Sequence, residues 1–194
     1  MNKAVFLDRD GTINEEVGYL RNPADLQLIP GAGAAIKRLN DAGMKVVLVT
    51  NQSGIARGYF SETLLHEIHA RLEQMLHDEG ARLDAIYYCP HHPSEGNSLY
   101  TKECDCRKPG TGLIDKAVCD LDIDVKHSYV VGDKWSDVEL GQRAGAHSIL
   151  VKTGYGSIDE GNVRPPHLID PDFIAYSLGE AADWITKQIE SDSG

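Results

Sequence analysis

The sequence predicts an α/β protein in which a parallel sheet lies between two layers of helices. Short, almost continuously apolar segments alternate with amphipathic segments along the 194 residues. Apolar segments of this kind are typical of strands that are covered on both faces. Because the connections are short, successive parallel strands must be joined by right-handed helical crossovers. We therefore expect a Rossmann-like sheet with three layers.

The strands and helices are expected in regular alternation. The expected strands are Ala4–Leu7, Lys45–Val49, Ala85–Tyr88, Tyr129–Val131, Ser148–Val151 and a last one near Phe173–Tyr176. The expected helices are Ala32–Asp41, Ser61–Glu79, Thr111–Leu121, Ser136–Ala144 and one near Gly179–Ile189. Ser61 suits a helix N-cap, and Gly43 and Gly80 stand where two helices should end.

Two segments depart from this alternation. Gly11–Pro30 mixes polar and apolar residues after the first strand and is expected to form a small flap over the strand end. Tyr88–Lys108 has no periodicity, and an irregular loop of that length requires a functional explanation. No repeat or linker divides the chain. We expect one domain over residues 1–194, with a minimal cap in the flap at about 11–30 and a metal-binding loop at 89–108.

The charge balance restricts the possible partners. With 30 Asp and Glu against 19 Lys and Arg, the net charge is −11. Nucleic acids and anionic membrane surfaces need a basic face, so we expect neither as a partner. No apolar run approaches the roughly 20 residues of a membrane span, and the first residues do not resemble a signal peptide. We expect a cytoplasmic protein, and a monomer because no apolar helix face is left over.

Carboxylates follow two of the expected strands. Asp8 and Asp10 come directly after the first strand, and residues i and i+2 of an extended chain point to the same side. A later strand is followed by Asp133 and Lys134, and the second strand by Thr50 and the turn amides after it. An acidic turn after one strand is common. Three polar strand ends at the same edge of a sheet predict a binding site.

This set of side chains suits phosphoryl transfer. A Mg²⁺ ion prefers oxygen ligands and lets an anionic nucleophile approach an anionic phosphate. One aspartate could attack phosphorus and form an aspartyl-phosphate, while the other protonates the leaving oxygen and then activates water. A hydroxyl, backbone amides and a lysine could hold the non-bridging oxygens.

The order of these motifs resembles the haloacid dehalogenase superfamily. The pattern consists of D-x-D-G-T, Thr-Asn, a lysine before a helix and G-D-x-x-x-D, and it extends over nearly the whole chain. The resemblance implies that Asp8 is the nucleophile and Asp10 the general acid and base. It also implies that Thr50 and Lys108 bind the phosphoryl group. The implied magnesium ligands are Asp8, Asp10 and Asp133, with Asp137 in a supporting position.

The loop at 89–108 carries a second candidate metal site. Cys89-Pro-His91 and Cys104-Asp-Cys106 could close a tetrahedral Zn²⁺ site of three thiolates and one imidazole. Free buried cysteines or a redox pair are the alternatives, although the usual C-x-x-C redox motif is absent. His91 matches the spacing of the second pair, and His92 competes with it. Four protein ligands leave no open position, so this zinc would be structural.

The remaining cysteine and the histidines of the long helix have simpler interpretations. Cys119 lies among apolar residues and is expected to be a core residue. His66, His69 and His77 have polar flanks and are expected on a solvated face of the helix.

Within the superfamily, the loop is similar to that of the D-glycero-D-manno-heptose 1,7-bisphosphate 7-phosphatases. Y-Y-C-P-H-H-P, C-D-C-R-K-P and T-N-Q-S-G-I-A-R-G carry this resemblance. It implies a sugar bisphosphate substrate and substrate contacts from the flap, the second strand end, the loop and the fourth strand end. These implied contacts are Glu16, Val17, Gly18, Tyr19, Thr50, Asn51, Gln52, Ser53, Arg107, Lys108 and Lys134.

Two other functions remain open from the sequence. Histidinol phosphatases share the zinc loop, so histidinol phosphate is an alternative substrate. A protein that kept the fold and its metal but only binds a ligand is the alternative outside catalysis.

Overall fold

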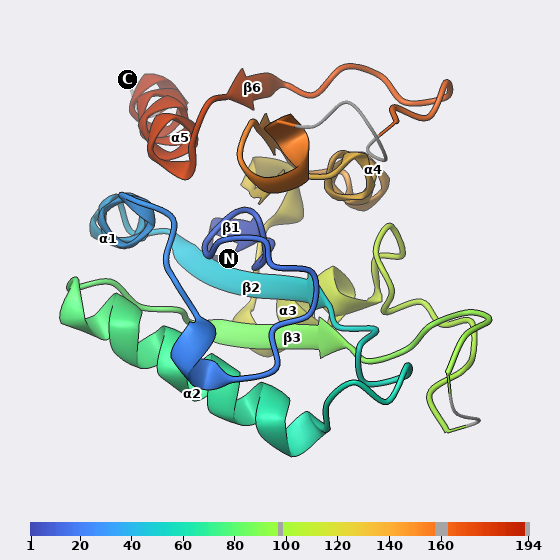
Figure 1. The fold of residues 1–194 in the computed structure, drawn as a ribbon. Helices are drawn as coiled ribbons and strands as arrows, with labels where there is room; N and C mark the ends of the chain where they lie inside the picture. Colours follow the sequence, from blue (N-terminus) through green and yellow to red (C-terminus); the bar gives the residue numbers. More distant parts are fainter. Residues whose placement is uncertain (97–98, 158–162, 193–194) are drawn as a thin grey trace.

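The computed structural model describes residues 1–96, 99–157 and 163–192. Its centre is a six-stranded, fully parallel sheet with the order β3-β2-β1-β4-β5-β6 (Figure 1). The strands are β1 (Ala4–Leu7), β2 (Lys45–Asn51), β3 (Ala85–Cys89), β4 (Tyr129–Gly132), β5 (His147–Val151) and β6 (Phe173–Ala175). The predicted α/β class and parallel sheet are confirmed.

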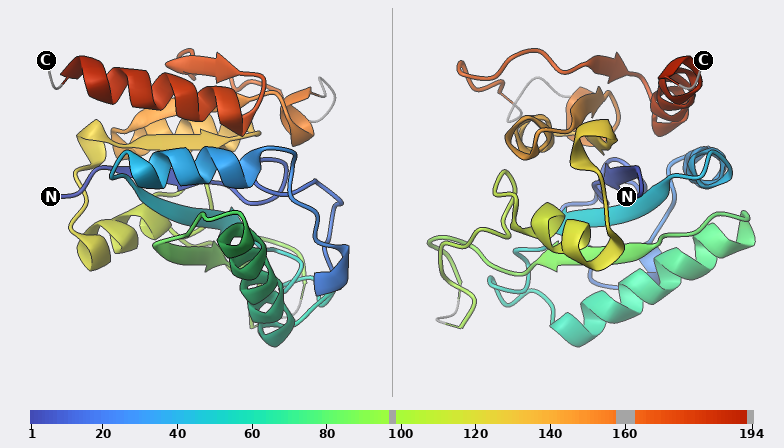
Figure 2. Two further views of the ribbon diagram at one scale, coloured as in Figure 1. Left: turned by 90° about the vertical axis from the view of Figure 1, so that its left-hand side faces the viewer. Right: turned by 180° about the vertical axis from the view of Figure 1, so that it is seen from behind.

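Helices cover both faces of the sheet. They are α1 (Ala32–Asp41), α2 (Glu62–Asp78), α3 (Gly112–Leu121), α4 (Trp135–Ala144) and α5 (Leu178–Asp192). Three short 3₁₀ helices span Pro23–Asp25, Val125–His127 and Gly154–Ser157. The helices α5, α1 and α2 lie on one face, and α3 and α4 lie on the other (Figures 1 and 2).

The strand sequences explain the two layers. Successive residues of a strand point to opposite faces. In β1, Val5 and Leu7 pack against α1 and α2, whereas Ala4 and Phe6 pack toward α3. Both sets are fully buried, which is why the strand is apolar at every position.

The chain reverses its direction across the sheet at β1. From β1 it proceeds to β2 and β3 on one side, and then returns to place β4 on the other side of β1. Ligands of open α/β sheets bind outside the carboxyl ends of the strands at such a reversal. The carboxyl ends of β1, β2 and β4 are therefore the place to look for a site.

The strands β2, β3 and β4 extend further at their carboxyl ends than the sequence predicts, and β5 begins one residue earlier. β2 continues through Thr50 and Asn51, because these residues pair with Tyr88 and Cys89 of β3. β4 likewise continues to Gly132. The polar residues at the sheet edge are thus held in the hydrogen-bonded sheet, which fixes their directions.

The flap and the loop both lie near this edge. The flap is attached through Ile13, Leu20 and Leu26, all buried in the core on the α1 side. Residues 53–60 and the loop meet in a smaller apolar cluster around Ile55 and Phe60. None of the described helices is both long and apolar enough to cross a membrane.

One core prediction is wrong. Cys119 is exposed, and the buried residues of α3 are Leu113, Ile114 and Ala117. Cys119 is two residues after Ala117, which turns it about 200° around the helix and away from the sheet.

Candidate active site

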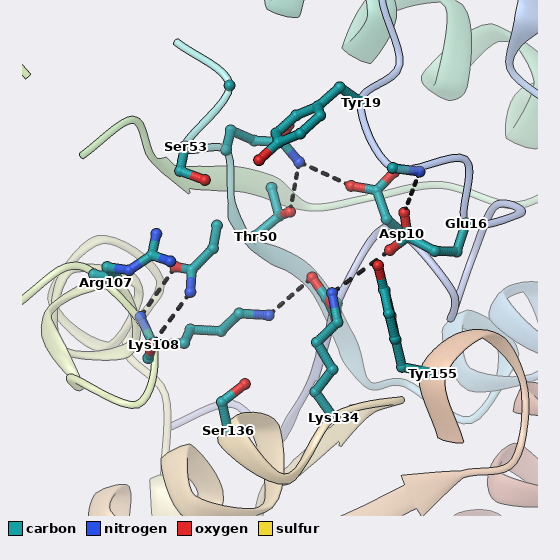
Figure 3. A pocket seen from close by; sticks show the side chains of 15 residues that line it. Asp10, Glu16, Tyr19, Thr50, Ser53, Arg107, Lys108, Lys134, Ser136 and Tyr155 are labelled. Atoms are coloured by element: carbon teal, nitrogen blue, oxygen red, sulfur yellow. Dashed lines mark hydrogen bonds and ion pairs between the residues drawn. The ribbon is translucent and has the colours of Figure 1, made fainter. Parts of the chain in front are cut away.

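A cavity of about 350 Å³ opens at the carboxyl ends of β1, β2 and β4. Its walls come from the flap, the end of β2, the loop, the start of α4 and the segment after β5 (Figure 3). The lining residues are Asp8, Asp10, Glu16, Gly18, Tyr19, Thr50, Asn51, Gln52, Ser53, Gly54, Arg107, Lys108, Lys134, Ser136 and Tyr155. The cavity therefore collects most of the residues that the sequence singles out.

Three buried carboxylates meet at the base of the cavity. Oxygens of Asp8, Asp133 and Asp137 all lie within 4.8 Å of one another. Asp8 continues the ladder of β1, because its N–H donates to the carbonyl of Val131 at 3.0 Å. Asp137 lies in the first turn of α4, where its Oδ2 accepts the N–H of Lys134 at 3.1 Å.

The tightness of this acidic group depends on a glycine. Gly11 has φ +80°, and a Cβ atom there would lie 2.2 Å from Oδ2 of Asp133 and 3.1 Å from Cα of Gly154. Any side chain would thus be strained and would displace a carboxylate. The Gly of D-x-D-G is required by the close approach of β1 and β4.

Two lysines offset part of this negative charge. Nζ of Lys108 lies 2.8 Å from Oδ1 of Asp8 and 2.6 Å from Oδ1 of Asp137. Burial alone would lower the pKa of Lys108, but the two carboxylates raise it. Burial and then the neighbouring Asp8 and Asp137 raise the pKa of Asp133 to about 8. The raised pKa of Asp133 shows that the three carboxylates repel one another even beside the lysines, and their oxygen donors fit a hard divalent cation.

Asp10 does not join this acidic group. Its carboxylate accepts hydrogen bonds from Arg9, from Nδ2 of Asn14 at 3.0 Å and from Nε2 of Gln52 at 3.0 Å. Burial raises the pKa of Asp10, but the charge of Arg9 and these hydrogen bonds outweigh it, so the pKa is lowered overall. Asp8 and Asp10 thus have different environments although both come from one strand end.

The second lysine connects the fourth strand end to the flap. Nζ of Lys134 lies 3.5 Å from Oε2 of Glu16 and 4.3 Å from the ring centre of Tyr155. Burial raises the pKa of Glu16, and Lys134 opposes that shift. In Figure 3, Lys108 and Lys134 both extend toward the centre of the pocket, where a phosphate could meet them.

The loop is anchored beside the second strand. Asn51 exchanges two hydrogen bonds with the backbone of Lys108, at 3.0 and 3.2 Å. Arg107 donates to the carbonyl of His91 at 3.0 Å. These contacts bring Arg107 and Lys108 from the loop to the wall of the cavity. The side chain of Asn51 is therefore used to hold the loop.

Two predicted site residues do not line the cavity, and three lining residues were not predicted. Asp133 is fully buried and lies within 4.8 Å of Asp8 without lining the cavity. Val17 does not line this cavity; it is 55 % exposed and borders a neighbouring hollow on the flap. Gly54, Ser136 and Tyr155 line the cavity without having been predicted. Tyr155 follows β5, so the rule that searches the carboxyl ends of strands could have found it.

The cysteine loop forms a compact group of four donor atoms. The Sγ atoms of Cys89, Cys104 and Cys106 are 3.1–3.5 Å apart, which is too far for a disulfide. Nδ1 of His91 lies 3.2, 3.4 and 3.7 Å from the sulfurs of Cys104, Cys106 and Cys89. A tetrahedron with Zn–S distances of about 2.3 Å has edges of about 3.8 Å, so the group needs to expand only slightly to hold zinc.

The same geometry separates the two histidines. His92 turns away from the sulfurs: its Nε2 lies 3.2 Å from Nη2 of Arg57, and its Nδ1 accepts the N–H of Glu95 at 2.9 Å. Burial and the neighbouring sulfurs raise the pKa of Cys89. A neutral thiol is a poor ligand, so a metal that binds here must stabilise the thiolate form of Cys89.

One histidine of α2 is buried, contrary to the prediction. His66 and His77 are exposed, but His69 is only 5 % exposed. It lies on the stripe of Leu65 and Leu72, and its Nε2 is 3.3 Å from Nη1 of Arg9. Burial, and next the charge of Arg9, lower its pKa to about 3.

This burial predicts a pH-dependent stability. In the unfolded chain this histidine has a pKa of 6.5, whereas in the folded protein His69 stays neutral until the pH approaches 3. The unfolded state therefore binds an extra proton between these pH values. The contribution of His69 to the free energy of unfolding is complete above pH 6.5 and declines as the pH falls toward 3. Between pH 7.5 and 5.5, the free energy of unfolding should decrease by about 1.4 kcal/mol more than in His69→Gln. Urea unfolding at both pH values measures this. His77→Gln should follow the wild type, and equal decreases in all three proteins would contradict the prediction.

Comparison with curated proteins identifies the family. The chain is 46 % identical over 187 residues to D-glycero-D-manno-heptose-1,7-bisphosphate 7-phosphatase of Thermosynechococcus vestitus, covering 94 % of each chain. It is 50 % identical over 178 residues to D-glycero-beta-D-manno-heptose-1,7-bisphosphate 7-phosphatase of Haemophilus ducreyi, covering 90 % of this chain and 97 % of that one. Residues 5–79 match the model of haloacid dehalogenase-like hydrolases, and residues 105–181 match a related HAD-hydrolase model.

The chain belongs to the haloacid dehalogenase family of phosphatases. Among solved structures, it resembles D,D-heptose 1,7-bisphosphate phosphatase from B. bronchiseptica, which was crystallised with magnesium and phosphate. The TM-score is 0.83 at 33 % identity, covering 96 % of this chain and 99 % of that chain. The corresponding enzyme from Burkholderia thailandensis has a TM-score of 0.68 at 29 % identity, covering 95 % and 99 %. Haloacid dehalogenase phosphatases use Mg²⁺, and the acidic group at the base of the cavity has the donors for it.

Proposed function

We propose that this haloacid dehalogenase phosphatase removes the 7-phosphate of D-glycero-D-manno-heptose 1,7-bisphosphate and yields heptose 1-phosphate. The observation that carries the proposal is the cavity, in which buried carboxylates face two lysines while Arg107 lies on the wall. Such a cavity suits one phosphate at the base and a second phosphate near Arg107. The names of the relatives and of the similar solved structures support the same substrate.

In the proposed mechanism, Asp8 is the nucleophile. One of its oxygens forms a bond to phosphorus, and the bond from phosphorus to the sugar oxygen breaks while Asp10, in its protonated form, gives that oxygen its proton. Asp10 then takes a proton from water, which attacks phosphorus and releases inorganic phosphate from Asp8. Lys108, 2.8 Å from Oδ1 of Asp8, orients the carboxylate. Thr50 and Lys134 can hold the phosphoryl oxygens through this exchange.

The proposed magnesium ligands are Asp8 and Asp133, through their side chains, and Asp10. The carboxylate of Asp10 is turned toward Arg9. Asp137 supports them, since both of its oxygens are already used for Lys108 and the Lys134 N–H. When bound, Mg²⁺ neutralises charge between the nucleophile and the phosphoryl oxygens. Glu16 and Tyr19 of the flap and Ser53, which follows β2, remain proposed contacts for the sugar.

For the loop we propose a structural Zn²⁺ bound by Cys89, His91, Cys104 and Cys106. The distances among these atoms support it, as does the finding that the group has four donors among the residues that the structure describes. Residues 1–194 would act as one phosphatase domain with the flap at 11–30 as a minimal cap. A monomer in the cytoplasm stays a prediction, as does the absence of nucleic-acid and membrane partners.

Parallel hydrolysis assays test the proposed substrate. Phosphate release from both anomers of the heptose bisphosphate and from histidinol phosphate should be compared at equal enzyme concentration. We expect kcat/KM for at least one heptose anomer to exceed that for histidinol phosphate by about 10²-fold or more, because a bisphosphate meets two cationic subsites. Faster hydrolysis of histidinol phosphate would overturn the substrate. Binding of all three without turnover would favour a non-catalytic module.

A further inference from the structure

We infer that Arg9 and His69 are positioning residues that hold the carboxylate of Asp10 in place for proton transfer. The inference rests on the proposed role of Asp10 in this phosphatase and extends it to two residues outside the cavity. Arg9 occupies the variable position of D-x-D-G-T, and His69 comes from the middle of α2, 60 residues further along the chain. Neither residue lines the cavity, so both would act through Asp10.

The guanidinium of Arg9 is buried, and its N–H groups reach Asp10 on one side and His69 on the other. Arg9 is 1 % exposed. Its Nε donates to Oδ1 of Asp10 at 3.1 Å, and its Nη2 reaches Oδ1 and Oδ2 at 3.0 and 2.8 Å. Because the guanidinium is planar and rigid, this fork fixes the plane of the carboxylate as well as its position.

His69 supports the far side of the same guanidinium. Nη1 of Arg9 lies 3.3 Å from Nε2 of His69, and arginine can only donate, so Nε2 is the acceptor. Such an imidazole is neutral, which agrees with its burial next to a cation. The ring of His69 also packs against the ring of Tyr88, and the two ring centres are 6.0 Å apart. His69 thus prevents Arg9 from turning about the Asp10 contact.

Gln52 completes the arrangement from the cavity side. Its Oε1 accepts from Nη2 of Arg9 at 3.2 Å, and its Nε2 donates to Oδ2 of Asp10 at 3.0 Å and to Oγ1 of Thr50 at 2.9 Å. A continuous set of hydrogen bonds therefore extends from His69 through Arg9 to the proposed acid and the proposed phosphate ligand.

The chemistry offers a way to separate positioning from general structural support. A sugar oxygen is a poor leaving group and needs the proton of Asp10, whereas p-nitrophenolate leaves without one. If His69 acts through Asp10, its loss should slow hydrolysis of the sugar phosphate but not the first transfer from p-nitrophenyl phosphate to Asp8. A variant that merely loosens the fold would slow both.

The experiment compares His69→Leu and His69→Gln with the wild type, all loaded with Mg²⁺. In His69→Leu, we expect kcat on the heptose bisphosphate to fall about 10- to 100-fold with KM within about twofold, while the burst of p-nitrophenolate keeps its rate. His69→Gln carries an amide oxygen that can accept from Arg9, and should recover to within about threefold of the wild type. His77→Leu, at an exposed position of the same helix, is the matched control and should retain wild-type rates.

A second variant covers the case in which His69→Leu does not fold. Arg9→Lys keeps the charge but lacks the fork, so it should give the same separation between sugar and aryl phosphate. The inference is overturned if the foldable variants slow both reactions alike, if they slow neither, or if His69→Gln recovers nothing. If the heptose bisphosphate is not hydrolysed but another sugar phosphate is, only the proposed substrate fails, and the comparison proceeds with that ester.

Discussion

Replacing Asp8 by asparagine should reduce the rate of phosphate release by at least about 10³-fold on every phosphate ester that the wild-type protein hydrolyses. The amide is a poor nucleophile, so the proposed bond from Asp8 to phosphorus cannot form. Steady-state release of inorganic phosphate from the heptose bisphosphate measures the effect. Acid-quenched samples of the wild type, but not of the variant, should retain phosphate covalently bound to the protein.

The same substitution should leave the protein folded. Asp8 shares the base of the cavity with Asp133 and Asp137, so removing its charge reduces repulsion among buried carboxylates. Lys108 keeps Asp137, 2.6 Å away, as a partner. We therefore expect Tm to stay unchanged or to rise. Asp41→Asn, at an exposed position of α1, is the matched control and should retain full activity. Near-normal phosphate release by Asp8→Asn would exclude the aspartyl-phosphate mechanism.

Replacing Cys106 by serine should have the second-largest effect. We expect bound zinc to fall from about one equivalent per chain to nearly none, because one ligand of a closed four-ligand site is lost. Arg107 and Lys108 directly follow Cys106, so the loss of the metal should also displace them from the cavity. Phosphate release should therefore decrease about 10- to 100-fold. Metal analysis after anaerobic purification and kinetic assays measure the two effects.

The chain provides its own control for this experiment. Cys119 is exposed on α3 and belongs to no described group of donor atoms, so Cys119→Ser should retain both zinc and activity. If Cys106→Ser kept one equivalent of zinc, or lost zinc without any change in phosphate release, the proposed role of the loop would be wrong. Hydrogen exchange of the residues around the loop would show whether its order depends on the metal.

Much of the site can be predicted because it depends on local rules. Asp8 follows an apolar strand directly, and the carboxyl ends of parallel strands meet at one edge of the sheet, so its position follows from the strand pattern. Cys104 and Cys106 are two residues apart and form half of their group by spacing alone. In both cases a short separation in sequence fixes where the side chains lie.

Other features depend on contacts between distant segments. His69 lies on the same stripe of α2 as Leu65 and Leu72, so the helical spacing was a signal for its burial. Only the tertiary structure shows that it contacts Arg9. Cys119 has apolar neighbours but lies on the outer side of α3. The apolar neighbours of Cys119 mislead because burial depends on which side of the helix faces the sheet.

The sequence by itself determined the parallel α/β fold, the edge of the sheet where the site lies and the residues that bring charge and metal ligands to it. These features follow from hydrophobic periodicity and from short spacings, which act over a few residues. The folded chain was needed to show that Asp137 joins Asp8 and Asp133 while Asp10 turns toward Arg9. It was also needed to show that His91 rather than His92 faces the sulfurs. The physical reason is that the direction of a side chain at a strand end is set by hydrogen bonds and charges from segments far away in the chain.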